Sequence, residues 1–328
     1  MKDICFVLLP GTLLLDLAGP AEAFRLANQR LQRRGRPAAY RLRYLGAQAA
    51  MGTSVGVELG ALEPLPDTLP AGSTVVLMGQ PSGQESALAK RVPPAWAETR
   101  RWLARVLAPR LAEDDLQLAC VCAGTLLAAD AGLLAARRCT THHESLDDLQ
   151  RLAPAAQVLR NRVFVVDGPV ASSAGITAGI DLALHLIARD VGEPVAAAVA
   201  QAMVVYLRRG PEDPELSPLL AGRNHLHPAV HRVQDAVSTQ PAEPWSMETL
   251  AEVACVTPRH LSRLFREHAG CSPHAYVQRV RLALAERAIA EGQPLKQAIA
   301  AAGIGGDRQW RRLRAGNGTR SNVLLTGH

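Results

Sequence analysis

Residues 246–268 read SMETLAEVACVTPRHLSRLFREH, and their order of polar and apolar positions predicts two short helices joined by a tight turn. Ser246 is a suitable N-cap for the first helix, although Thr249 in place of Glu or Gln leaves the usual capping box incomplete. Residues 255–256 form the turn. Thr257-Pro258 then supplies a cap and a proline at the first position of the second helix. This stretch therefore predicts a helix-turn-helix.

The second of these helices has two chemically different faces. Leu261, Leu264 and Phe265 recur at spacings of three and four, which predicts an inner, buried face. The outer side carries groups that can reach base edges or phosphates in the major groove of DNA, and these are Arg259, His260, Ser262, Arg263 and Arg266. We predict that these five residues contact DNA.

The positive charge of the chain is concentrated at its C-terminal end. Residues 221–328 carry 14 Lys and Arg against 8 Asp and Glu, whereas residues 1–220 carry 22 of each. A basic segment attached to a neutral one indicates an anionic partner such as DNA. A merely solvated arginine-rich surface is the alternative that charge alone leaves open.

The residues around this motif resemble the DNA-binding domain of the AraC/XylS family. The resemblance is carried by Leu250-Ala251, by 256–265, by Gly270, and by the pieces Ser272-Pro273, Tyr276, Arg279 and Arg281-Leu282-Ala283. That family has two helix-turn-helix units joined by a long helix, which the resemblance places here at about 273–291. The similarity extends over roughly 223–314.

The second helix-turn-helix unit departs from the family pattern. Residues 295–304 resemble its first helix and turn, with Ile304 where the family usually has Phe. Residues 307–312 resemble its recognition helix, which adds Arg308, Arg311 and Arg312 to the predicted DNA contacts. The resemblance stops at Arg314, and we expect 315–328 to be an atypical, partly disordered tail left by truncation or a frame shift.

Residues 1–209 alternate apolar strand-like runs with helical segments, which predicts βαβ units. The predicted strands are 4–9, 40–45, 74–78, 116–120 and 163–166. The predicted fold is a flavodoxin-like α/β domain, with a mainly parallel sheet and helices on both faces, followed by an all-α double helix-turn-helix domain. Three prolines within 211–218 mark a linker. The predicted organisation is therefore a sensor domain at 1–209, a linker at 210–222, a DNA-binding domain at 223–314 and a tail at 315–328.

Cys122 lies between a predicted strand and a predicted helix, in the stretch Ala119–Leu127. The following Ala123-Gly124 permits the sharp turn of a nucleophile elbow, and a helix N-terminus favours a thiolate. Together with Glu22 and His142, this cysteine resembles the centre of the PfpI-like branch of the class I glutamine amidotransferase superfamily. The pieces at 16–20, 131–134, 141–142 and 173–181 resemble its fused sensor version, the GlxA-type regulators.

Two departures argue against catalysis by this centre. Ala123 stands where the related hydrolases usually have His, and the glycine pair of their oxyanion hole is reduced to Gly79-Gln80. The regulators also typically have Trp at the position of His143. We predict that Glu22, Cys122, His142 and His143 line a ligand pocket at the carboxyl ends of the strands. An inert elbow cysteine and a catalytic cysteine remain the alternatives.

The resulting prediction is a ligand-responsive, sequence-specific transcriptional regulator and not an enzyme. By resemblance it is a homodimer that binds promoter DNA, with an amine or amino-acid derivative as its effector. The alternatives are a Cys-dependent hydrolase or hydratase, and a regulator whose DNA binding is impaired by the altered C-terminus.

The remaining features exclude several other classes of protein. No apolar run of about 18 residues lacks a charge, so we expect no membrane partner. The six cysteines form no disulfide framework, which indicates a reduced, cytoplasmic chain. No cofactor is expected. No metal site is expected either, because His225 and His227 have no carboxylate cluster beside them.

Overall fold

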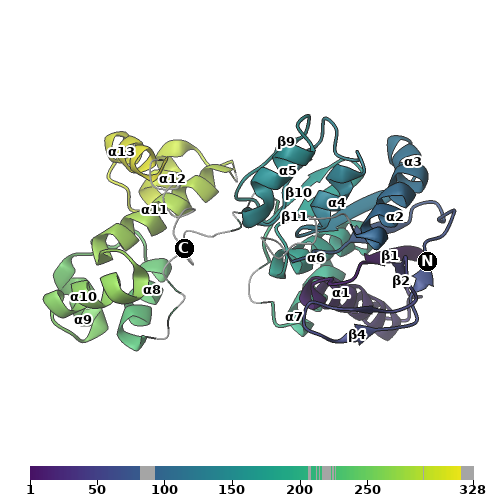
Figure 1. Cartoon of the computed structure of the whole chain (residues 1–328). Coiled ribbons are helices and arrows are strands. Elements are labelled where there is room, and N and C mark those ends of the chain that lie inside the picture. Colours follow the sequence, from purple (N-terminus) through teal and green to yellow (C-terminus); the bar gives the residue numbers. More distant parts are fainter. Residues whose placement is uncertain are drawn as a thin grey trace. The chain divides into compact units, whose positions relative to one another are not determined.

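The computed structural model of the chain describes residues 1–81, 93–205, 208–211, 213, 215, 223, 225, 227–290 and 292–318. The chain forms two compact units, Met1–Glu215 (unit 1) and Leu216–His328 (unit 2) (Figure 1). Most of the predicted linker at 210–222, and residues 319–328 of the predicted tail, lie outside the described residues.

The described part of unit 1 is organised around a seven-stranded sheet with the order β10-β11-β7-β6-β1-β2-β5. These strands are β1 (Lys2–Leu8), β2 (Tyr40–Gly46), β5 (Glu63–Pro64), β6 (Thr74–Leu77), β7 (Gln117–Val121), β10 (Phe164–Asp167) and β11 (Val170–Ser173). Only the β10–β11 pair of this sheet is antiparallel. β1 is buried from Asp3 to Leu8, as a central parallel strand with helices on both sides requires.

Two short strand pairs lie outside this sheet. β3 (Met51–Gly52) pairs antiparallel with β4 (Glu58–Leu59), and β8 (Arg138–Cys139) pairs parallel with β9 (Gln157–Val158). The loop that follows β8 carries the predicted pocket histidines, so this second pair helps to position them.

Helices cover both faces of the sheet (Figure 1). α1 (Leu14–Arg33), α6 (Thr177–Val191) and α7 (Glu193–Ala202) pack against one another, and α4 (Gly124–Asp130) packs against α2 (Pro94–Trp102) and α5 (Leu146–Leu152). The chain continues from α2 through a π-helical turn (Leu103–Leu107) into α3 (Ala108–Ala112), where Pro109 occupies the first turn and needs no N–H partner.

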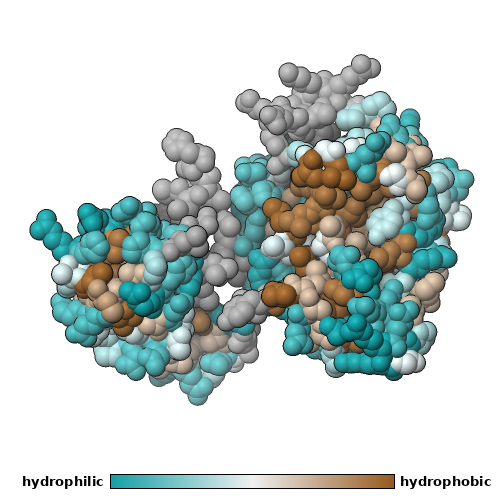
Figure 2. All heavy atoms as spheres, turned by 90° about the horizontal axis from the view of Figure 1, so that it is seen from below, coloured by the Kyte–Doolittle hydropathy of each residue, from teal (hydrophilic) through white to brown (hydrophobic). Residues whose placement is uncertain are grey.

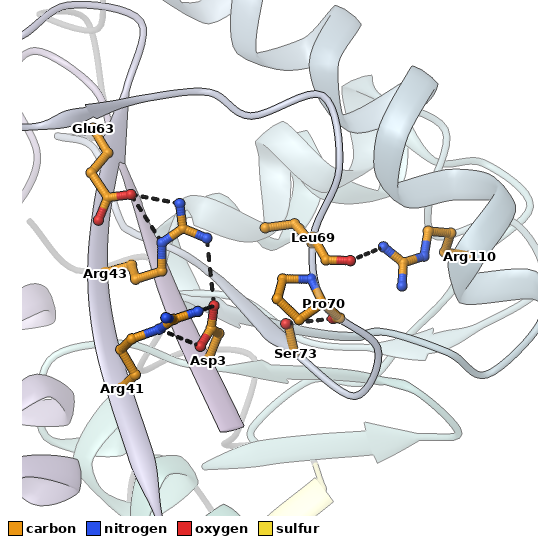
Figure 3. Close-up of polar contacts among 8 residues, drawn as sticks. All are labelled: Asp3, Arg41, Arg43, Glu63, Leu69, Pro70, Ser73 and Arg110. Carbon is orange, nitrogen blue, oxygen red and sulfur yellow. Dashed lines mark hydrogen bonds and ion pairs between the residues drawn. The ribbon is translucent and has the colours of Figure 1, made fainter. Parts of the chain in front are cut away.

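The amino edge of the sheet is held by charged groups (Figure 3). The buried Asp3 carboxylate accepts hydrogen bonds from Arg41 at 2.8 and 2.6 Å, and Arg43 joins it to Glu63. The Arg41 hydrogen bonds hold the pKa of the Asp3 carboxyl below its usual value. These contacts tie β1, β2 and β5 together at the edge opposite the Cys122 elbow.

The described part of unit 2 is helical. Its helices are α8 (Pro228–Thr239), α9 (Met247–Ala254), α10 (Pro258–Ala269), α11 (Pro273–Ala290), α12 (Leu295–Ala301) and α13 (Asp307–Gly318). α11 contributes Tyr276 and Val280 to one core with α8–α10, and Leu282 and Ala285 to a second core with α12 and α13. This confirms the predicted fold class of an α/β sheet domain with an all-α double helix-turn-helix domain. α13 runs four residues past Arg314, where we expected the domain to end.

Within the described ranges, none of the helices is both long enough and apolar enough to cross a bilayer.

Candidate functional site

The first helix-turn-helix is formed by α9 and α10. Thr249 N–H donates to Ser246 Oγ at 3.2 Å, and Ser246 N–H donates to Thr249 Oγ1 at 2.9 Å. The capping box is therefore complete, contrary to our expectation, because a threonine hydroxyl reaches the backbone amide that Glu or Gln would otherwise serve. Cys255 then turns the chain in the left-handed conformation, with φ at +55°.

α10 buries its predicted inner face. Leu261, Leu264 and Phe265 lie in the core of unit 2. On the predicted outer face the side chains of Arg259, Arg263 and Arg266 are exposed, while His260 and Ser262 are half-buried. The spacing of these residues therefore leaves a row of guanidinium groups open to a partner.

α13 presents a second row of arginines. Trp310 is buried and fixes the helix against α11 and α12. Ile304, which stands in the family's Phe position, is also buried in this core. The side chains of Arg308, Arg311 and Arg312 are exposed. The second recognition helix is therefore formed, although the sequence departs from the family pattern after Arg314.

The electrostatics of these two helices suit an anionic partner. Among the residues that the structure describes, none of the six arginines on α10 and α13 (Arg259, Arg263, Arg266, Arg308, Arg311 and Arg312) forms an ion pair with a carboxylate. Guanidinium groups without a carboxylate partner can exchange their counterions for phosphates without breaking an ion pair. Arg263 Nη2 lies 3.2 Å from His260 Nδ1, a contact between two side chains of the same outer face. These arginines are accordingly the strongest candidates for the DNA-binding surface.

In unit 1 the predicted elbow is formed as expected. Cys122 follows β7 with φ at +55°, and α4 begins two residues later at Gly124. A Cβ at Gly124 would lie 2.5 Å from the Leu77 carbonyl oxygen, so only glycine lets α4 approach β6 this closely. Hydrogen bonds from Cys122 N–H to the Ser173 carbonyl (3.0 Å) and from the Thr141 hydroxyl to the Cys122 carbonyl (2.8 Å) fix the turn.

The acidic partner of this cysteine is not the one that we predicted. Glu22 is about half exposed and pairs with Arg25 on the surface of α1, so the structure does not bring it to Cys122. Asp16, in the first turn of α1, is fully buried, and its negative charge acts on the Cys122 thiol. Its Oδ1 also accepts the Ile176 N–H at 2.8 Å. The sequence signal was present, because Asp16 begins the Asp-Leu-Ala-Gly-Pro piece that carries the family resemblance.

Two glycines enclose the Cys122 side chain. A Cβ at Gly79 would lie 2.2 Å from Asp16 Oδ2 and 2.8 Å from Cys122 Cβ. A Cβ at Gly175 would lie 2.4 Å from Cys122 Cβ and 2.6 Å from its Sγ. As a result Cys122 is only 4% exposed.

This enclosure changes the chemistry expected of the thiol. Burial, followed by the negative charge of Asp16, raises the pKa of Cys122 far above its usual value. The helix N-terminus was expected to favour the thiolate, but the loss of hydration outweighs that effect and Cys122 is a neutral thiol near pH 7. The Asp16 carboxyl pKa is also raised by burial.

His142 and His143 lie beside this centre. The charge of His142 acts on Asp16, and the two histidine rings are 4.2 Å apart between centroids. His143 Nδ1 lies 2.9 Å from Glu215 Oε1. The structure therefore brings three of the predicted pocket residues, Cys122, His142 and His143, to one edge of the sheet. It also adds Asp16 and Glu215, which our sequence analysis missed.

A hollow of about 510 Å³ lies elsewhere in unit 1, lined among others by Lys2, Tyr40 and Asp190. It contains none of the candidate residues, and its lining offers no arrangement of groups comparable with the Cys122 centre.

A cysteine-elbow α/β unit and a double helix-turn-helix unit in one chain together define a class, the DNA-binding transcriptional regulators with an attached sensor-type domain. Comparison with known families agrees with this. The helix-turn-helix domain model matches residues 250–312, and the DJ-1/PfpI family model matches residues 97–189.

The chain is 32% identical to the HTH-type transcriptional regulator CdhR of Pseudomonas aeruginosa, over 86% of this chain and 78% of that protein. It is 29% identical to the HTH-type transcriptional regulator GbdR of the same species, over 86% of this chain and 72% of that protein. An isonitrile hydratase of Pseudomonas putida is 41% identical over 30% of this chain and 42% of its own length. The chain belongs to the AraC-type helix-turn-helix transcriptional regulators that carry a DJ-1/PfpI domain.

Proposed function

We propose that this regulator contacts promoter DNA through α10 and α13 and binds a small effector beside Cys122 in unit 1. The observation that carries the DNA-binding part is the set of six exposed arginines on the outer faces of these two helices. Their inner faces are committed to the core, whereas the arginines have no carboxylate partner among the described residues. Two helices with this division of faces argue against an enzyme-only chain.

The effector that we propose is a small amine or amino-acid derivative. Asp16 Oδ2 is buried without a hydrogen-bond partner in the described structure, and Glu215 is nearly buried beside His143. A buried acceptor that lacks a partner is stabilised by a donor, and a cationic ammonium group supplies both the donor and the opposite charge. The carboxylates around Cys122 therefore favour a cationic effector.

We infer that unit 1 senses its ligand without turning it over. The neutral, enclosed Cys122 thiol is a poor nucleophile, and Ala123 replaces the histidine that follows the cysteine in the related hydrolases. The segment shared with the isonitrile hydratase keeps a Cys-dependent hydratase as the second candidate. That candidate predicts turnover that is lost in Cys122→Ser.

We further propose that the regulator acts in the cytoplasm as a homodimer formed through unit 1. Figure 2 shows apolar side chains gathered on the side of unit 1 where α1, α7 and β4 lie in Figure 1. Four large apolar residues remain exposed on or beside these elements: Leu15 on α1 (54%), Val55 (66%) and Val57 (48%) before β4, and Val204 (86%) after α7. An apolar patch of this kind is characteristic of a surface that a second copy covers.

The test is a salt titration of the full-length protein on DNA from upstream of its own gene and its neighbours. Arg263→Ala should weaken selective binding by about 1–3 kcal/mol and lower the salt slope by about 1, because one phosphate or base contact is lost. Arg105→Ala is the matched control. It removes the same charge from an exposed pair with Asp67 in unit 1 and should leave binding unchanged.

Equal binding by wild type and Arg263→Ala would overturn the assignment of α10. If wild type itself shows no selective binding, a chain with a family-like C-terminus restored separates a damaged tail from an enzyme. Recovery of selective binding identifies the tail as the cause, and continued failure with Cys122-dependent turnover identifies the hydratase.

A further inference from the structure

The loop after β8 and the segment that ends unit 1 bring two imidazoles and a carboxylate together. Among the residues that the structure describes, His142, His143 and Glu215 are the one group of three potential metal-ligating side chains whose ligand atoms all lie within 4.8 Å of one another. Glu215 follows His143 by 72 positions, so the spacing of these residues in the sequence does not indicate the group.

We propose that His142, His143 and Glu215 bind a divalent first-row transition-metal ion such as Zn²⁺. Two imidazole nitrogens and one carboxylate oxygen are a ligand set that zinc and iron(II) sites use, whereas Mg²⁺ and Ca²⁺ prefer all-oxygen sites. Three protein ligands leave at least one coordination position for water or for a donor atom of an effector.

The separations fit such an ion. Metal–nitrogen and metal–oxygen bonds of about 2.0–2.2 Å place neighbouring ligand atoms about 3.0–3.5 Å apart. His143 Nδ1 and Glu215 Oε1 are 2.9 Å apart. The remaining separations are within 4.8 Å, and we expect rotation of the two half-buried imidazole rings to bring them into that range when an ion binds.

Two further observations point to a ligand at this place. His142 Nδ1 is buried and has no hydrogen-bond partner among the described atoms, and a bound ion satisfies such a nitrogen. The Glu215 side chain is 11% exposed, so a nearly buried carboxylate is available to balance the charge of the ion. Glu144 Oε2 lies 3.6 Å from His142 Nδ1 and adds negative charge beside the cluster.

An ion bound to this cluster would join two segments of unit 1 that are far apart in the sequence. The segment carrying Glu215 is held on unit 1 by Arg209, which donates to Asp181 at 2.8 Å, and by the Val163 N–H, which donates to the Asp213 carbonyl at 3.0 Å. Glu215 is the last residue of unit 1. An ion bound there joins the loop beside Cys122 to the segment through which the chain leaves unit 1.

The test is a titration of Co²⁺ into chelator-treated, reduced full-length protein, followed by visible absorption. Glu215→Gln and His143→Trp should each bind one Co²⁺ fewer than wild type, or bind it at least tenfold more weakly, because each lacks one ligand. His274→Gln is the matched control, because it removes one exposed imidazole from α11 and should bind like wild type. The measured quantity is the difference in bound Co²⁺ between wild type and each variant. A second ion held by His227 and His268, whose ring centroids are 4.7 Å apart, would be present in every protein and would cancel in this difference.

The difference spectrum between wild type and each variant should show nitrogen and oxygen ligation, without a thiolate-to-cobalt charge-transfer band. Equal stoichiometry and affinity in wild type and in both variants would overturn the proposal, as would a thiolate band in the difference spectrum. The two variants alter different elements, so one remains informative if the other does not fold. The readout involves no DNA, and its failure leaves the proposed regulatory function untouched.

Discussion

Replacing Gly175 with alanine is expected to destabilise unit 1 through a collision with Cys122. Gly175 has φ at +98°, and an added Cβ would lie 2.4 Å from Cys122 Cβ and 2.6 Å from Cys122 Sγ. An alanine with positive φ destabilises the folded state by about 1–2 kcal/mol. Alanine also lowers the conformational entropy of the unfolded chain, which offsets about 0.4–1 kcal/mol of this loss. Overpacking adds about 1–3 kcal/mol. The expected loss in the free energy of unfolding is therefore roughly 1–5 kcal/mol.

Gly192→Ala separates the two contributions. Gly192 has φ at +100°, nearly the same as Gly175, but its added Cβ would meet its nearest neighbour at 3.7 Å, in ordinary contact. Gly192 has ψ at 151°, a backbone region that glycine alone adopts readily, so a lower melting temperature of the Gly175 variant reports the packing against Cys122 and not a greater backbone strain. At about 2–4 °C per kcal/mol for a unit of this size, calorimetry of the full chain should find the Gly175 variant melting below the Gly192 variant, by up to roughly 12 °C.

A second substitution tests whether Cys122 is the cause. Cys122→Gly removes the two atoms that the new methyl group would approach most closely, leaves Cys122 Cα at 2.9 Å, and suits the left-handed backbone at that position. In the double variant the cost of Gly175→Ala should fall by at least about 1 kcal/mol, as a coupling between residues in contact. Additive effects of the two substitutions in the double variant would refute the enclosure of the thiol.

Three further substitutions test the electrostatics and the backbone. Burial raises the pKa of the Asp16 carboxyl, so the folded chain binds more protons than the unfolded one above the ordinary carboxyl pKa, and stability falls as pH rises. Asp16→Asn should therefore raise the melting temperature more at pH 8 than at pH 4, and the opposite ranking would contradict the buried charge. Asp3 has its pKa lowered by the hydrogen bonds from Arg41, so it stabilises the fold above its unfolded pKa and loses that effect as pH falls. Asp3→Asn should cost about 1–3 kcal/mol at pH 7 and little at pH 3, measured by urea unfolding. Cys255→Gly should stabilise unit 2 by about 0.5–1 kcal/mol, because the residue is exposed with φ at +55° and glycine adopts that conformation without strain; no gain in a thermal melt would count against the strained turn.

The central strands could be predicted because burial on both faces demands continuous apolar runs. Ile4–Leu9 and Thr74–Met78 agree with β1 and β6 to within two residues at each end. β11 was missed because its residues, Val-Ala-Ser-Ser, show neither an apolar run nor alternation. Its serines are fully buried because neighbouring backbone serves them, as the Thr140 N–H that donates to Ser172 Oγ at 2.9 Å does.

The elbow and the recognition helices could likewise be predicted from local chemistry. Cys122 is placed by a strand, a small residue and a glycine that are consecutive in the chain. The arginines of α10 are placed by a helical period that puts Leu261 and Phe265 on the other side. The acid beside Cys122 could not be placed in this way. Glu22 and Asp16 lie on the same helix, and which of them faces the elbow depends on how α1 sits against β6 and α6.

The sequence by itself determined the two-unit plan, the mainly parallel sheet, the helix-turn-helix and the family. Each of these depends on patterns within about 30 consecutive residues, where periodicity, caps and turns act locally. Tertiary structure alone decided that Asp16 is the partner of Cys122, that the thiol is neutral, and that Glu215 meets His142 and His143. Those outcomes depend on burial and on distances between segments far apart in the chain, and desolvation, which dominates the Cys122 pKa, exists only once the chain has closed around the side chain.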